Sequence, residues 1–315
     1  MQTRPLGRSG LSIAPLMFGG NVFGWTADRE TTFRLLDAFV AAGFNAIDTA
    51  EAYSSWVPGH KGGDSEALIG EWLEKSGKRD QVVIATKVGW HDGGETGLLR
   101  EANIIRAAED SLKRLKTDVI DLYQSHKDDA GTPFEETLGA FARLIEQGKV
   151  RAVGASNISA ERLQEALDVS GRTGLPRYES VQPPYNLYDR RAFEDELQPL
   201  VEREGLGVIS YYGLAAGFLT GKYRSQDDLA KSTRGGGVSR YLDTRGFRIL
   251  GVLDEVSDAM SATPAQVALA WLMHKPAITA PIASATSVEQ FEELAKAAEL
   301  KLDPATLATL DAASV

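Results

Sequence analysis

The sequence predicts an α/β fold of the (β/α)8 TIM-barrel class, and three observations support this prediction. The chain has 315 residues, a length that fits one such barrel with insertions. Eight short apolar runs rich in β-branched residues recur along it, which is the number of strands that a closed barrel requires. Stretches of helical period separate the runs, and this alternation implies parallel strands covered by helices. We therefore expect a single barrel domain over residues 1–315.

The elements are expected in strict alternation along the chain. The predicted strands span residues 14–19, 45–49, 82–87, 118–126, 150–156, 179–182, 206–212 and 277–282. The predicted helices span residues 28–43, 65–77, 100–116, 133–148, 159–171, 189–205 and 287–300. A glycine that closes the last helical turn is expected at Gly43, Gly77, Gly148, Gly171 and Gly205. An open doubly wound sheet alternates in the same way, but "FGGNVFGW" lacks the G-x-G-x-x-G spacing of a dinucleotide-binding sheet, which favours the barrel.

Two segments interrupt the alternation. The opening "RPLGRSGLSIAPL" indicates a β-hairpin that turns between Gly7 and Gly10 and closes one end of the barrel. After the seventh strand, residues 213–245 form a long loop rich in Gly, Ser, Thr and Arg. A loop of this length in a compact domain is usually a lid or a binding loop.

Composition excludes several classes of protein. The net charge of -10 argues against a broad basic surface and hence against nucleic acid as a partner. The lack of cysteine excludes disulfides, thiolate metal sites and a cysteine nucleophile. No apolar run approaches the roughly 18 residues of a membrane span, and the N-terminus lacks a continuous signal-peptide core. We expect a soluble cytoplasmic protein without a membrane or metal partner, and the sequence indicates no oligomeric state.

Four polar side chains are expected at the mouth of the barrel, where the carboxyl ends of the strands hold the active sites of this fold. Asp48 and Lys87 end the second and third predicted strands, Tyr53 follows in the loop after Asp48, and His126 follows the fourth strand. Taken alone, an Asp, a Lys or a Tyr at such a position is more often structural, and the His is as often structural as functional. Together they suit proton transfer, because Lys87, held cationic by Asp48, would lower the pKa of the Tyr53 phenol from about 10. His126 would orient a substrate oxygen or relay the proton.

Carbonyl reduction on this site would need an organic cofactor, because no protein side chain donates a hydride. Ser156 and Asn157 after the fifth strand and Gln182 after the sixth carry groups that hydrogen-bond a carboxamide. Tyr211 in the seventh predicted strand can stack on a flat ring. These positions suit a cofactor that carries a carboxamide and a flat ring.

Motifs over nearly the whole chain resemble the aldo-keto reductase superfamily. They are "RPLGRSGLSIAPLMFGG", "GFNAIDTAEAYS", "ATKVG", "DVIDLYQSHKDD", "GKVRAVGASN", "VQPPYNLYDR", "ISYYGLAAGFLTGKY" and "PIASATSVEQFEEL". The resemblance implies NAD(P)H-dependent reduction of a small-molecule aldehyde or ketone without metal. It makes Tyr53 the general acid, Lys87 and Asp48 the residues that tune it, and His126 the residue that orients the carbonyl.

The same resemblance implies a cofactor path across the barrel mouth, with residues 213–222 along the pyrophosphate and residues 284–293 at the adenosine end. The implied cofactor-binding residues are Gly20, Asn21, Ser156, Asn157, Gln182, Tyr211, Gly213, Leu214, Gly217, Leu219, Gly221, Lys222, Ser284, Thr286, Gln290 and Glu293. The chain departs from the family pattern where Tyr212 and Gly213 replace a Ser-Pro pair. It also has Thr286 and Ser287 where many members carry a cation for the 2′-phosphate. NADP(H) is expected, and NAD(H) is the alternative.

Trp25, Trp56 and Trp90 follow the first three strands and are candidates for the substrate pocket, as well as for the core. Glu51 is expected to support its loop outside the proton path. A metal-dependent hydrolase that uses Asp48, Glu51, His126 and Asp128 as ligands is a first alternative function. A non-catalytic cofactor-sensing subunit is a second, because potassium-channel beta subunits resemble the same superfamily. The presence of His126 after "LYQS" favours the enzyme.

Overall fold

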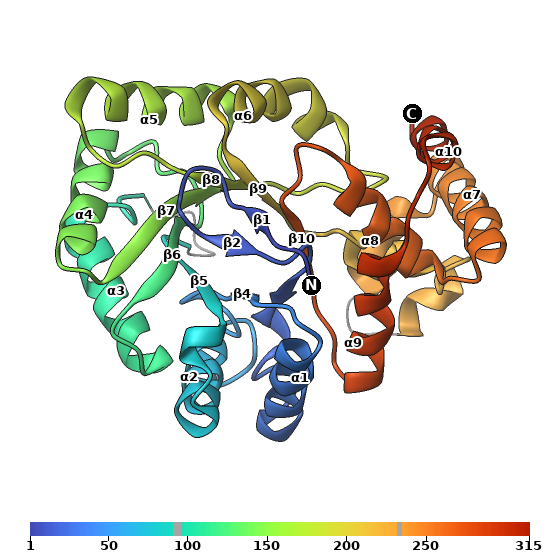
Figure 1. Cartoon of the computed structure of the whole chain (residues 1–315), viewed down its shortest axis with the longest axis horizontal. Coiled ribbons are helices and arrows are strands. Elements are labelled where there is room, and N and C mark those ends of the chain that lie inside the picture. The colour runs from blue at the N-terminus through green and yellow to red at the C-terminus, as the bar shows by residue number, and fades with distance from the viewer. Residues whose placement is uncertain (91–95, 232–234) are drawn as a thin grey trace.

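Residues 1–90, 96–231 and 235–315 are described by a computed structural model of the chain, drawn in Figure 1. Eight parallel strands close into a barrel in chain order, with the last strand paired to the first. Their bounds are β3 (Met17–Gly19), β4 (Ala46–Asp48), β5 (Val83–Val88), β6 (Ile120–Ser125), β7 (Val150–Ser156), β8 (Ser180–Gln182), β9 (Gly207–Ser210) and β10 (Ala280–Ala283). Each of the eight predicted runs overlaps one strand, so the predicted TIM barrel is confirmed.

Helices surround the barrel as an outer ring (Figure 1). Their bounds are α1 (Arg29–Ala41), α2 (Asp64–Ser76), α3 (Glu101–Leu115), α4 (Phe134–Glu146), α5 (Ala160–Thr173), α6 (Gln198–Glu204), α7 (Thr244–Met260), α8 (Pro264–His274), α9 (Val288–Ala295) and α10 (Pro304–Ala313). The prediction missed α7, α8 and α10. Helix α8 is buried from Ala265 to Met273, so it lacks the polar face on which a helical period depends. No helix in the described ranges is long and apolar enough to cross a membrane.

Helix ends follow the predicted glycines with one exception. The predicted positive φ is found at Gly43, Gly77, Gly148 and Gly205. The prediction for Gly171 was wrong, because α5 continues to Thr173 and ends at Gly174, whose φ is 74°. Nothing lies within 4 Å of the place where a Cβ of Gly171 would be, so this glycine faces open space inside a regular helix.

The N-terminal hairpin closes the barrel at the amino ends of the strands, as predicted. Strands β1 (Arg4–Pro5) and β2 (Ser12–Ile13) pair antiparallel and lie across the middle of the ring in Figure 1. The side chains of Leu6, Leu11 and Ile13 are at most 3% exposed and pack with the inner residues of the barrel. Apolar side chains therefore fill this end of the barrel.

Side-chain alternation places the polar residues at the opposite end of the barrel. The barrel interior contains Met17, Ala46, Ala85, Leu122 and Ile209. Because side chains on one face of a strand recur every two residues, the next inward positions are Gly19, Asp48, Lys87, Gln124 and Tyr211. Each of these lies at or beside the carboxyl end of its strand. The same alternation that builds the core therefore directs this set of groups into the mouth.

The long segment after β9 contains more regular structure than its sequence indicated. Three short 3-10 helices follow one another there, η4 (Ala215–Thr220), η5 (Gln226–Lys231) and η6 (Gly235–Tyr241). Residues 232–234 of the predicted loop lie outside the described residues. Three further short helices are η1 (Gly20–Val22), η2 (Arg79–Gln81) and η7 (Lys296–Glu299), and the π-helical turn η3 (Ala192–Leu197) leads into α6.

Candidate active site

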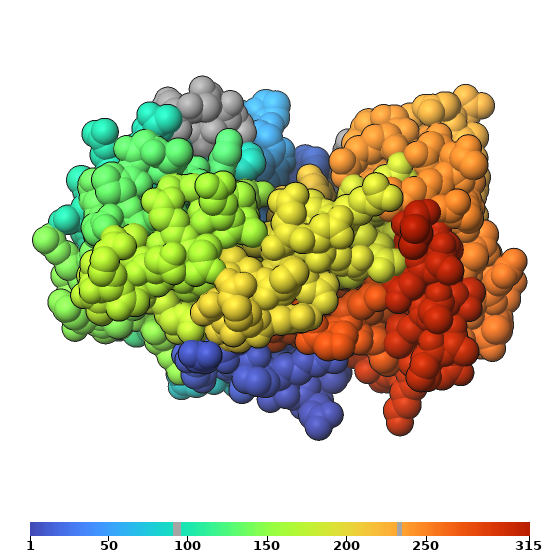
Figure 2. Space-filling model, turned by 90° about the horizontal axis from the view of Figure 1, so that it is seen from above, coloured from blue at the N-terminus to red at the C-terminus, as the bar shows by residue number. Residues whose placement is uncertain are grey.

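A cavity of about 620 Å³ opens at the carboxyl ends of the barrel strands. Figure 2 shows a notch on the edge opposite the dark blue N-terminal residues, between the light blue segment and the orange segment. Most of the predicted site residues line this cavity: Asn21, Asp48, Tyr53, Trp56, Trp90, His126, Ser156, Asn157, Gln182, Tyr211, Gly213, Leu214, Gly217, Lys222, Ser284, Thr286 and Gln290. The volume falls in the range of about 300–1,000 Å³ that is typical of small-molecule sites.

Several predicted site residues do not line the cavity: Gly20, Trp25, Lys87, Leu219, Gly221 and Glu293. Leu219 is fully buried in the hydrophobic core. Gly20 lies behind the wall, where an added Cβ would be 2.9 Å from the hydroxyl of Ser65. The carboxylate of Glu293 accepts a hydrogen bond from Thr263 at 3.0 Å. These residues shape the walls and do not face the cavity.

Asp48, Tyr53 and Lys87 form one hydrogen-bonded group. The Nζ atom of Lys87 donates to Oδ2 of Asp48 at 2.7 Å and to the carbonyl oxygen of Thr49 at 2.9 Å, and it lies 2.9 Å from the hydroxyl of Tyr53. The Tyr53 hydroxyl donates to the same Oδ2 at 3.0 Å. The other oxygen of Asp48 accepts from Nε2 of Gln182 at 2.8 Å. The three side chains predicted to act together therefore share one contact network.

The pKa of Tyr53 is raised, whereas the sequence-based prediction was that Lys87 would lower it. Burial raises it well above the usual value of 10, and the neighbouring Asp48 raises it further, both by its charge and by the hydrogen bond. Burial also lowers the pKa of Lys87, against the opposing effect of Asp48. The phenol is therefore protonated at neutral pH, because burial and the neighbouring carboxylate both disfavour the phenolate.

His126 lies beside the Tyr53 ring, with 5.9 Å between the ring centroids, and 5.0 Å from the ring centroid of Trp90. Burial lowers its pKa well below the usual 6.5, and the positive charge of Lys87 lowers it further. The imidazole is therefore neutral at neutral pH. Its main-chain oxygen accepts a hydrogen bond from the side chain of Asn157 at 2.8 Å.

The predicted carboxamide-binding residues form a second polar group, which adjoins the first through the contact of Gln182 with Asp48. The hydroxyl of Ser156 donates to the main-chain oxygen of Gln182 at 2.9 Å, and Nδ2 of Asn157 donates to Ser156 at 3.1 Å. The Tyr211 hydroxyl donates to Oδ1 of Asn157 at 2.8 Å. These contacts hold hydroxyl, amide and aromatic groups along one side of the cavity.

The end of the cavity near β10 is neutral. The hydroxyl of Ser284 donates to Oδ1 of Asn21 at 2.7 Å. Both the main-chain nitrogen and the hydroxyl of Thr286 donate to Oε1 of Gln290, at 2.8 and 3.2 Å. Within the described part of the chain, Lys222 is the single lysine or arginine that lines the cavity.

Aromatic side chains surround the entrance. Trp56 and Trp90 line the cavity and are 45% and 38% exposed. Trp25 does not line it, and instead packs edge-on against Trp56 with 5.8 Å between ring centroids. Tyr212, which the prediction did not place in the substrate pocket, lines the cavity and is 54% exposed. The entrance therefore offers flat apolar surfaces on several loops.

Gln124 is a polar neighbour of the site that the prediction missed, although it does not line the cavity. It is buried, and its side chain lies 3.5 Å from the amide of Gln182. The two-residue period from Leu122, the same signal that places Lys87 in the mouth, was sufficient to find it.

The ligand set of the metal-hydrolase alternative does not converge. Asp48 is engaged with Lys87, Asp128 accepts from Arg162 at 2.8 Å, and Glu51 accepts from the main-chain nitrogen of Gly89 at 3.0 Å. The described residues contain no group of three or more His, Asp or Glu side chains that could hold a metal ion. The contact of Glu51 with Gly89 is in keeping with the expected supporting role.

Comparison with known proteins identifies the family. The model of the aldo/keto reductase family matches residues 15–315. The chain belongs to this family. It is 36% identical to the uncharacterized oxidoreductase YrpG of Bacillus subtilis (strain 168), over 99% of this chain and 95% of that protein. It is 33% identical to a probable voltage-gated potassium channel subunit beta of Arabidopsis thaliana, over 95% and 92%. It is 31% identical to the protein tas of Escherichia coli (strain K12), over 99% and 97%.

Membership in the aldo/keto reductase family supports a general oxidoreductase role, and this family typically uses nicotinamide cofactors. The residues present fit such a cofactor. Hydroxyl and amide groups of Ser156, Asn157 and Gln182 line the cavity together with the ring of Tyr211, which is the chemistry that a carboxamide on a flat ring requires.

Proposed function

We propose that this aldo/keto reductase reduces an aldehyde or ketone to an alcohol, with Tyr53 as the general acid and residues 1–315 acting as one domain in the cytoplasm. One observation carries the proposal. Tyr53 lines the cavity, and its hydroxyl lies within hydrogen-bond distance of both Asp48 and Lys87, at 3.0 and 2.9 Å. A phenol in such a position can give its proton to a carbonyl oxygen that enters the cavity.

The proton moves from the Tyr53 hydroxyl to the substrate oxygen as negative charge develops there. The raised pKa keeps the phenol protonated until that moment. The ammonium group of Lys87 then stabilises the phenolate that remains, and Asp48 holds Lys87 in place. A positioned acid of this kind typically contributes about 10²- to 10⁴-fold in rate.

His126 orients the carbonyl. Its ring is buried beside Tyr53 and is neutral, so one ring nitrogen carries a hydrogen that can be donated to the substrate oxygen. Its Nδ1 atom is buried and has no hydrogen-bond partner among the described residues. A neutral donor fixes the angle of the carbonyl without competing with Tyr53 for the transfer of the proton.

A reduced nicotinamide dinucleotide supplies the hydride when it is bound. Ser156, Asn157 and Gln182 would hold its carboxamide, and Tyr211 would stack on its ring. The stretch from Gly213 to Lys222 would follow the pyrophosphate, where Lys222 provides a positive charge. The residues after β10 would hold the adenosine end.

NADP(H) is the proposed form of the dinucleotide, on the basis of family resemblance. NAD(H) is the second candidate, and the neutral character of the β10 end favours it. Thr286 and Gln290 line that end, and Gln290 is already engaged with Thr286. A direct comparison of the affinities for NADPH and NADH decides between the two, since equal affinities would mean that the chain has no working site for the 2′-phosphate.

A cofactor-sensing subunit is the second candidate function, because the chain is 33% identical to a probable channel beta subunit. The neutral His126 beside Tyr53 supports the enzyme instead. Oxidation of NADPH and NADH should be followed with aldehydes, ketones, sugars and quinones. The enzyme proposal requires turnover that depends on the added carbonyl. Tight nucleotide binding without turnover on any of these compounds would favour the sensing subunit.

A further inference from the structure

In the segment after β9, four of residues 212–217 have left-handed backbone. Tyr212, Ala215 and Ala216 have φ values of 56°, 49° and 57°, and Gly217 follows at 98°. Side chains with a Cβ rarely adopt this region, so such a segment persists only where neighbouring groups hold it. Tyr212, Ala216 and Gly217 also line the cavity. The contacts that hold this strained segment therefore determine the shape of the cavity wall.

Asn186, in the loop after β8, makes the first of these contacts. Its side chain is fully buried, and Nδ2 donates to the main-chain oxygen of Tyr212 at 3.0 Å. The same Nδ2 lies 3.2 Å from Oδ2 of Asp189. Its Oδ1 accepts from the main-chain nitrogens of Tyr188 and Asp189, at 2.8 Å each, which closes a tight turn. The carboxylate of Asp189 is thereby linked to Tyr212.

Through η6, Asp189 is also linked to Phe218, the residue that directly follows the strained segment. Its Oδ2 accepts from Arg240 and from the hydroxyl of Tyr241, both at 2.8 Å. The buried ring of Tyr241 stacks on Phe218 of η4, with centroids 5.4 Å apart and an angle of 17° between the planes. The ring of Tyr188 meets Tyr241 edge-on at 4.9 Å. The exposed ion pair between Arg240 and Asp189 contributes little stability by itself. The hydrogen bond from the buried Tyr241 is therefore the main contact between Asp189 and η6.

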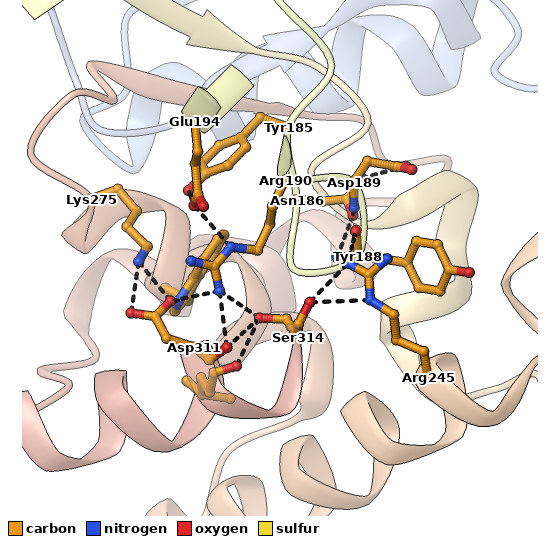
Figure 3. A network of polar contacts seen from close by, with 12 residues as sticks. Tyr185, Asn186, Tyr188, Asp189, Arg190, Glu194, Arg245, Lys275, Asp311 and Ser314 are labelled. Atoms are coloured by element: carbon orange, nitrogen blue, oxygen red, sulfur yellow. Dashed lines mark hydrogen bonds and ion pairs between the residues drawn. The ribbon is translucent and has the colours of Figure 1, made fainter. Parts of the chain in front are cut away.

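The loop that carries Asp189 is anchored to the C-terminal end of the chain, as Figure 3 shows. Arg245 of α7 donates to the main-chain oxygens of Tyr188 and Ser314, at 2.6 and 2.8 Å. Arg190 donates to the hydroxyl of Ser314 at 2.6 Å and to Glu194 at 2.8 Å. These contacts fix the position of the loop relative to α7 and the C-terminal residues. Asp189 can therefore hold the segment after β9 and η6 in place.

We propose that Asp189 is a positioning residue that holds Tyr212–Gly217 in the shape that binds the pyrophosphate of the dinucleotide. It does not line the cavity, and it acts through Asn186 on one side and Tyr241 on the other. This inference rests on the proposed function, because that function places the dinucleotide against this segment. Loss of the Asp189 contacts leaves the hydrogen bonds of Tyr53 with Asp48 and Lys87 unchanged. It lowers the affinity for the dinucleotide.

The test uses Asp189→Asn, in which a neutral amide replaces the carboxylate that accepts three hydrogen bonds, and Tyr241→Phe, which removes one donor and keeps the ring. Asp110→Asn is the matched control, because it removes a carboxylate that pairs with Arg106 at 3.1 Å on the surface of α3. The dissociation rates of NADPH and NADH are measured by stopped-flow fluorescence on the full chain. Hydrogen exchange of the amides in residues 212–221 is measured without nucleotide.

Asp189→Asn is expected to raise the dissociation rate and the KM of the dinucleotide about tenfold, the effect of losing one to two hydrogen bonds. In Asp189→Asn, the KM of the carbonyl substrate should stay within about twofold of wild type, and amide exchange in residues 212–221 should accelerate. In Asp110→Asn, the dissociation rate and both KM values should stay within about twofold of wild type. Unchanged dissociation and unchanged exchange in both Asp189→Asn and Tyr241→Phe would overturn the inference while the proposed function stands. If the wild-type chain binds neither nucleotide, the proposed function fails, and unchanged exchange in the variants would refute the positioning role independently.

Discussion

The ammonium group of Lys87 lies 2.7 Å from the carboxylate of Asp48, and their side chains are 0% and 1% exposed. Two charges at this depth remain ionised only where each has a close partner and further hydrogen bonds. Gln182 and the main chain of Thr49 supply those bonds. The pair is therefore part of the fold of the mouth as well as of the proposed proton path.

Breaking this pair is expected to destabilise the fold. Lys87→Met leaves Asp48 as an uncompensated buried charge and should lower the free energy of unfolding by about 3–5 kcal/mol. The same replacement at Lys78, whose contact with Asp37 is more exposed, should lower it by less than about 1 kcal/mol. Urea denaturation measures both values. Equal effects at the two lysines would contradict the prediction.

Tyr53→Phe removes the proton that the proposed mechanism donates. Carbonyl reduction should fall by at least about 10²-fold, because a positioned acid typically contributes that much. The ring remains, so affinity for the dinucleotide should stay within about twofold, since substitutions away from a binding contact have small effects. Steady-state kinetics and tryptophan fluorescence titration measure the two quantities. Turnover close to wild type in this variant would remove Tyr53 from the mechanism.

The depressed pKa of His126 predicts a pH dependence of stability. Below about 6.5, the unfolded chain takes up a proton on this residue that the folded chain does not, so the free energy of unfolding should fall with falling pH. One such group contributes at most about 1.4 kcal/mol per pH unit. His126→Gln should therefore show a flatter decline than wild type between about pH 6.5 and 5. Denaturation curves at a series of pH values measure it, and identical slopes would refute the prediction.

Gln290→Arg tests the choice of dinucleotide. An arginine at the neutral β10 end should strengthen binding of NADPH about 10- to 100-fold, because a charge-assisted hydrogen bond contributes about 1.5–3 kcal/mol. Binding of NADH, which has no 2′-phosphate, should change little. Gln290→Met, which loses the contact with Thr286 without adding a charge, is the control. An equal increase in affinity for NADPH and NADH would mean that residue 290 lies away from the 2′ position of the bound nucleotide.

The barrel could be predicted from the sequence, because the spacing of apolar residues and the positions of the turn glycines are local signals. Each can be recognised from residues that are close together in the chain. The same alternation set Asp48 and Lys87 at strand ends, and it contained the signal for Gln124, which was overlooked. Helix α8 escaped prediction because a fully buried helix has no polar face to set a period.

Only the tertiary structure determined the pKa values of the buried groups and the contacts between loops that are distant in sequence. The pKa of Tyr53 rises because packing buries it and aims its hydroxyl at Asp48. Asp189 joins η6 to the loop after β8 across 52 residues of sequence, and Gln182 reaches Asp48 across 134. Burial and such distant contacts arise when the closed barrel brings strand ends together, and no local pattern of residues encodes them.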